Sequence, residues 1–85
     1  MEIRVIKIKK IEKGALQAFA EVQIGQVQIK GFRVVKQPNQ SAWVSVPQVE
    51  YVKDGEKRYF NLIDLPNDLK RKVQDAVLVA WEKQG

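Results

Sequence analysis

The sequence predicts an α+β fold, in which an antiparallel β-sheet of four to six strands, built from hairpins, precedes a single C-terminal α-helix. Runs rich in β-branched residues occupy positions 3–60, and Gly14 and Gly25 mark turns between them. Apolar residues recur with a helical period only after Pro66. The chain has 85 residues, which fits one domain covering 1–85.

The first three strands are expected at 3–11, 15–24 and 27–36. In the first, the apolar positions change parity after Val5, which predicts a β-bulge near that residue and Ile6. Gly31 in the third strand predicts a second bulge. The second strand alternates regularly, and its apolar face consists of Leu16, Ala18, Ala20, Val22 and Ile24.

A polar loop leads to a short strand at 43–46, which ends at Pro47 because proline has no N–H to donate. A hairpin follows at 49–60 around the turn formed by Asp54 and Gly55. The tip of this hairpin has no apolar side chain to bury. We therefore expect a mobile arm or an edge hairpin that lies outside the core.

The helix is predicted to begin after Pro66, with Asn67 or Asp68 as its N-cap. Leu78 and Val79 lie on its flank and back, where they are either single exposed apolar residues or part of a partner surface. The stripe that packs on the sheet follows the helical period: Leu69, Val73, Ala76, Val77 and Ala80, with Trp81 at its edge.

The composition argues against an enzyme and against a membrane protein. The chain has no cysteine and no histidine, so thiolate metal sites and the usual general base near neutral pH are missing. We expect no catalytic residues, no cofactor, no metal and no small-molecule substrate. No apolar run approaches the roughly 20 residues of a transmembrane helix. The first residues lack the pattern of a signal peptide, which predicts a cytoplasmic protein.

The net charge of +5 resides in the first half of the chain. Residues 1–40 carry eight basic and three acidic side chains, whereas residues 41–85 carry seven of each. A basic half predicts a polyanionic partner, either nucleic acid or an anionic membrane surface. The alternative is a solvated basic face that keeps the protein soluble.

Lys70, Arg71 and Lys72 form a basic run in the predicted first turn of the helix. Cations are unfavourable at this positive pole, so the run indicates a bound anion, most naturally a phosphate. The alternative is local pairing, because Asp68 precedes Lys72 by four residues and Asp75 follows Arg71 by four.

Lys7, Lys9 and Lys10 on the first strand, with Arg4 and Lys13 beside them, are the second candidate for phosphate contact. Lysines on an edge strand also discourage aggregation, so this pattern has a purely structural explanation as well. Further basic residues lie on the third strand and are a weaker signal because their predicted faces differ: Lys30, Arg33 and Lys36.

Five aromatic residues could stack on bases, as in proteins that bind single strands. Core packing is the favoured explanation for Phe32 and Trp43, which lie in apolar strands. Tyr51 and Tyr59 flank the Asp54 turn and are expected to form a cross-strand pair. Phe19 lies among polar residues on the polar side of the second strand.

Several motifs together resemble the SpoVG family of bacterial septation and regulatory proteins. They are Phe32-Arg33-Val34-Val35, a polar loop, Trp43-Val44-Ser45-Val46-Pro47, Asp54-Gly55-Glu56 and Lys72-Val73-Gln74-Asp75-Ala76-Val77-Leu78. The resemblance implies a sheet with a C-terminal helix, a homodimer formed through strands, and regulators that bind DNA and RNA. Lys70 and Lys72 match basic positions of the family, whereas Arg71 stands where the family tends to have glycine.

Three functions follow as hypotheses. The leading one is a dimeric regulator that binds DNA or RNA through phosphate contacts at the helix start, assisted by the strand lysines. The second is a protein–protein interaction module without a nucleic-acid role. The third is a catalyst that uses carboxylates, which the composition disfavours.

Overall fold

The computed structural model describes residues 2–84 and has the predicted α+β architecture. Within that range the chain forms six strands and then one helix. In chain order these are β1 (Ile3–Lys13), β2 (Leu16–Ile24), β3 (Val27–Val35), β4 (Trp43–Ser45), β5 (Gln48–Lys53), β6 (Glu56–Asn61) and α1 (Asn67–Gln84). No helix in this part of the chain is long and apolar enough to cross a membrane.

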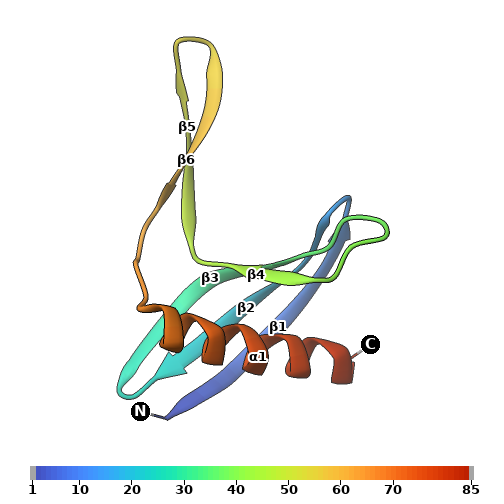
Figure 1. The fold of residues 1–85 in the computed structure, drawn as a ribbon, viewed down its shortest axis with the longest axis vertical. Coiled ribbons are helices and arrows are strands. Elements are labelled where there is room, and N and C mark those ends of the chain that lie inside the picture. Colours follow the sequence, from blue (N-terminus) through green and yellow to red (C-terminus); the bar gives the residue numbers. More distant parts are fainter. Residues whose placement is uncertain (1, 85) are drawn as a thin grey trace.

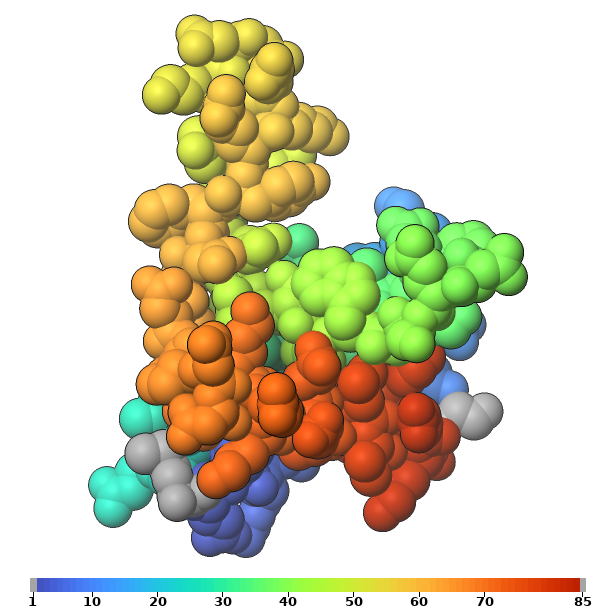
Figure 2. Space-filling model, viewed as in Figure 1, coloured from blue at the N-terminus to red at the C-terminus, as the bar shows by residue number. Residues whose placement is uncertain are grey.

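The strands form two separate antiparallel sheets. The first has the order β1-β2-β3-β4, in which each strand pairs with its neighbours in the sequence. The second contains only β5 and β6, which rise as a long hairpin away from the rest of the molecule (Figure 1). Helix α1 lies across one face of the four-stranded sheet, and the hairpin stands clear of both (Figure 2).

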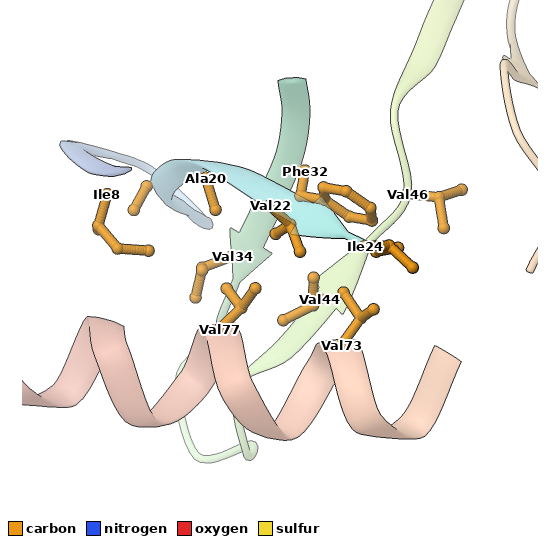
Figure 3. Close-up of a cluster of buried hydrophobic side chains, with 11 residues drawn as sticks. Ile8, Ala20, Val22, Ile24, Phe32, Val34, Val44, Val46, Val73 and Val77 are labelled. Atoms are coloured by element: carbon orange, nitrogen blue, oxygen red, sulfur yellow. The ribbon is translucent and has the colours of Figure 1, made fainter. Parts of the chain in front are cut away.

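The core lies between α1 and the sheet, where small side chains of β2 meet the valines of the helix (Figure 3). The regular alternation predicted for β2 is confirmed, because Ala18, Ala20, Val22 and Ile24 are buried and Leu16 is half-buried. The helix contributes Val73 and Val77 as its buried residues. Since alanine and valine are short, the helix can approach the sheet closely along this line.

Both predicted bulges are present, and the second has a consequence for the opposite face of the sheet. The register of β1 shifts between Val5 and Lys7, so Ile6 is the extra residue. The register of β3 shifts at Gly31, whose φ of +97° is one that residues with a side chain rarely adopt. A Cβ on Gly31 would also lie 3.4 Å from that of Pro47. Because of the bulge, Lys30 and Arg33 point to the same face although they are three residues apart.

Two aromatic predictions are wrong. Trp43 is not a core residue, because it is 47% exposed at the start of a three-residue edge strand. Its neighbour Val44 points inward in its place, while Phe32 is buried as predicted. Tyr51 pairs with Arg58, and Tyr59 pairs with Glu50. The two tyrosines therefore lie on opposite faces of the hairpin and do not form a cross-strand pair.

The helix begins slightly earlier than predicted. Its first turn is closed by the N–H of Lys70, which donates to the carbonyl of Pro66 at 2.8 Å. Pro66 therefore takes the capping position expected for Asn67 or Asp68. At the other end, Val79 is exposed as expected, but Leu78 is half-buried against the core. The two do not form one exposed patch.

We expect Val77→Ala to lower stability far more than Val79→Ala, although both replace a valine on the same helix. Val77 has no exposed surface and Val79 is 50% exposed. Removing two buried methyl groups costs about 2 kcal/mol, which corresponds to a fall in Tm of about 8–16 °C in a domain of this size. The exposed site should cost less than about 0.5 kcal/mol. Thermal melts followed by circular dichroism measure both, and equal effects would contradict the described core.

We expect the β5–β6 hairpin to exchange its amide hydrogens faster than β2. All residues from 51 to 60 are exposed, and the hairpin pairs with no other strand among the described residues. A lone two-stranded hairpin is marginally stable in water, so it opens locally at low free energy. Hydrogen exchange followed by mass spectrometry tests this, and protection at Gly55 and Glu56 equal to that of the sheet would contradict it.

Candidate nucleic-acid interface

The face of the four-stranded sheet that points away from α1, here called the outer face, collects basic residues from β1 and β3, on either side of β2. Directly opposite residues of an antiparallel pair share a face, so the register defines rows across the sheet. One row runs from Lys9 through Phe19 to Arg33. The next runs from Lys7 through Glu21 to Lys30. The outer face thus brings residues far apart in the sequence into one patch.

This patch has a strong excess of positive charge. A third row places Arg4 beside two glutamines, and Glu21 is the acidic residue in the three rows. The ion pairs within 4.0 Å that residues 2–84 form involve Glu2, Glu50 and Glu56, and none involves Glu21. The cations of the patch are Lys7, Lys9, Lys30 and Arg33, and at its margin Arg4 forms an ion pair with Glu2 at 3.4 Å. Several cations within a Debye length of about 8–10 Å add their potentials, which favours a polyanion.

An aromatic ring lies at the centre of the patch. The guanidinium carbon of Arg33 lies 5.8 Å from the centre of the Phe19 ring, within the range of a cation–π contact. The Nε of Arg33 is buried and has no hydrogen-bond partner among residues 2–84. Beside the ring is a hollow of about 150 Å³, bordered by Lys7, Lys9 and Lys30. The patch therefore combines cations, a ring and an indentation.

Lys10 does not belong to this patch, although its neighbours Lys7 and Lys9 do. It lies opposite Ala18, one of the core residues, and therefore points to the side of the sheet that carries the helix. Its ammonium donates a hydrogen bond to the carbonyl of Gln84 at 3.0 Å. A cation at the C-terminal end of a helix is favourable because the helix dipole is negative there. The structure thus gives Lys10 a role in holding the helix end.

The basic run Lys70, Arg71 and Lys72 is exposed but does not converge on one point. Successive residues of a helix point about 100° apart, so the three side chains spread over about 200° of its circumference. The N–H of Lys70 is also already bonded to the carbonyl of Pro66, so this residue offers no free backbone donor to an anion. Among the described residues, neither Lys72 nor Arg71 forms the predicted ion pair with Asp68 or Asp75 within 4.0 Å.

Lys70 alone of the three borders a second hollow, of about 190 Å³, between α1, β4 and the base of the hairpin. Trp43 and Gln74 also line this space, and Gln74 accepts a hydrogen bond from the N–H of Val44 at 3.4 Å. That contact ties the helix to the edge strand. Lys70 is the one cation among the described residues that line this hollow, so it presents less positive charge than the outer face.

Sequence reasoning placed Lys7 and Lys9 among the candidate residues but missed the partners that the outer face supplies. Simple alternation places Lys30 and Arg33 on opposite faces of the third strand. Gly31 was the available signal, since a bulge at that glycine reverses the parity of the residues that follow. Phe19 was visible as an aromatic residue on a polar strand face.

The comparisons with known proteins give no relative for this chain: no family model, no curated protein and no solved structure matches it. The similarity to the SpoVG family therefore stays a prediction. Among the described residues there is also no cluster of three or more acidic side chains, histidines or cysteines suited to a metal ion.

Proposed function

We propose that this protein binds DNA or RNA through the outer face of its four-stranded sheet. The observation that carries the proposal is the meeting of cations from β1 and β3 around Phe19 and a single acid, Glu21. Neighbouring strands are about 4.8 Å apart, so the long lysine side chains can reach successive phosphates of one backbone. A flat basic surface of this kind fits a phosphate chain better than it fits a small anion.

The proposal also assigns a part to the helix start. Lys70, Arg71 and Lys72 lie on the other layer of the molecule, and their spread around the helix prevents them from holding one phosphate together. They add to the long-range attraction between the protein and a polyanion. On this view the outer face makes the contacts, and the helix start contributes to the rate of encounter.

Two further expectations, that the protein is not an enzyme and that it acts as a regulator, extend this proposal. Binding with no catalytic step agrees with a chain that lacks cysteine and histidine. The similarity to SpoVG proteins and the basic sheet face both support the same role, which is that of a regulator acting on nucleic acid in the cytoplasm. The proposal therefore describes a nucleic-acid-binding regulator and not an enzyme.

A second proposal is that the chain forms a homodimer through its strands. β1 is an edge strand of eleven residues, and one side of its backbone has no strand partner among residues 2–84. Long free edges and exposed apolar patches are typical of protein contacts. The hairpin exposes apolar side chains on both of its faces: Val49, Tyr51, Val52, Tyr59, Phe60 and Leu62. The same features favour the alternative of a protein-interaction module without a nucleic-acid role.

To test the site, two triple variants remove the same charge from different surfaces: Lys7, Lys9 and Lys30 to Gln, or Lys70, Arg71 and Lys72 to Gln. Each phosphate contact contributes about −0.9 to the slope of log affinity against log salt on duplex DNA. We expect the sheet variant to flatten this slope by about 2–3 units and the helix variant by less than about 1. Fluorescence anisotropy with labelled duplexes at several salt concentrations measures both.

Circular dichroism of the two variants controls for folding. If the helix variant flattens the slope as much as the sheet variant, the outer face is not the main site. If the parent protein does not bind nucleic acid even at low salt, the protein-interaction function replaces the proposed one.

The dimer is tested by sedimentation equilibrium at micromolar concentration. We expect a species of twice the chain mass of 9.8 kDa. A small domain with a core of this size is marginally stable alone, and burying the edge of β1 and the hairpin would add apolar contacts. A single species at the monomer mass across the concentration range would contradict the dimer.

A further inference from the structure

The ring of Phe19 is out of place on a face that serves only to bind phosphates. Its cross-strand partners are Lys9 and Arg33, and the neighbouring residue of the same strand face is Glu21. The contact with Arg33 stabilises the ring, but phosphate binding does not require an aromatic side chain at the centre of the face, and the part of the ring that stays in water is unfavourable. Phe19 is half-buried and borders the hollow, so part of the ring is open to a ligand.

The size of the hollow suits a single planar ring. Its volume is about 150 Å³, and an apolar protein cavity of about 150 Å³ is known to accommodate benzene. A pyrimidine base has the same six-membered ring. The hollow is open on the outer face, so a base could enter it while its sugar and phosphate remain at the surface beside Lys7, Lys9 and Lys30.

The charge around the hollow favours a base over a phosphate inside it. Glu21 borders the hollow together with the lysines. A carboxylate repels a phosphate placed next to it, but it accepts hydrogen bonds from the N–H groups on the edge of a base. The lysines at the rim attract phosphates. The carboxylate therefore favours a base inside the hollow, and the lysines favour the backbone beside it.

We propose that the outer face binds single-stranded nucleic acid, with one unpaired pyrimidine base held in the hollow against Phe19 and the adjoining phosphates held by Lys7, Lys9 and Lys30. This inference rests on the proposed function and specifies its ligand. Stacking on an aromatic side chain requires an open base face, which a duplex does not offer. The contact of Arg33 with Phe19 helps to hold the ring in place beside the hollow.

The experiment compares labelled oligo(dT), oligo(U) and an abasic phosphodeoxyribose strand of equal length in anisotropy titrations. All three carry the same backbone charge, and oligo(dT) also shares its sugar with the abasic strand, so the difference between those two reports base contacts. We expect oligo(dT) and oligo(U) to bind about 5- to 100-fold more tightly than the abasic strand, as stacking of a base on an aromatic ring does elsewhere. The comparison of DNA with RNA shows whether the sugar matters.

Phe19→Leu provides the second arm, with Phe60→Leu as a matched control because Phe60 lies exposed on the hairpin. We expect Phe19→Leu to remove the advantage of the strands that carry bases and to leave the abasic affinity and its salt slope unchanged. Phe60→Leu should keep the advantage. Circular dichroism confirms folding, and the comparison of strands on the parent protein stands even if Phe19→Leu does not fold.

Each outcome separates this inference from the proposed function. If all three strands bind the parent equally, or if folded Phe19→Leu keeps the advantage, the base site is wrong while nucleic-acid binding through charge stands. If none of the strands and no duplex binds at low salt, the proposed function and this inference both fail.

Discussion

The packing of α1 on one face of the sheet is the contact on which the rest of the molecule depends. Val73 and Val77 of the helix meet Ala18 and Val22 of β2, and all four are essentially without exposed surface. One helix covers one face of a sheet, so this contact leaves the other face in water. Because there is a single helix, the outer face has to be polar. The alternation of β2 places its polar residues on that face.

A polar face does not have to be a basic one. Cross-strand pairs of lysine with glutamate would keep the outer face soluble and would stabilise the sheet as well. In this protein Glu21 lies between Lys7 and Lys30, and the row of Lys9 and Arg33 has Phe19 in the corresponding place. The unbalanced cations repel one another, and a phosphate backbone would relieve that repulsion. This excess is the physical basis for assigning the face to nucleic acid.

Periodicity predicted the regular parts of the fold, and its failures are local. The strands, the bulges, the core face of β2 and the helix follow from patterns within one segment. The grouping of Lys30 with Arg33 follows only when the bulge at Gly31 is applied to the faces of β3, a step that simple alternation leaves out. The exposure of Trp43 depends on β4 being a short edge strand. Strand alternation alone separates Lys10 from Lys9, but the hydrogen bond of Lys10 to the helix end depends on tertiary structure that the sequence pattern does not contain.

The most direct test of the account is to map binding onto the backbone of the folded protein. In an NMR titration of the isotope-labelled chain with a single-stranded oligonucleotide, the amide signals of Lys7, Lys9, Phe19, Lys30 and Arg33 should shift together and saturate at one affinity. The signals of residues 70–72 should move much less. Shifts confined to the helix start, with the outer face unchanged, would contradict the central claim that the sheet is the binding surface.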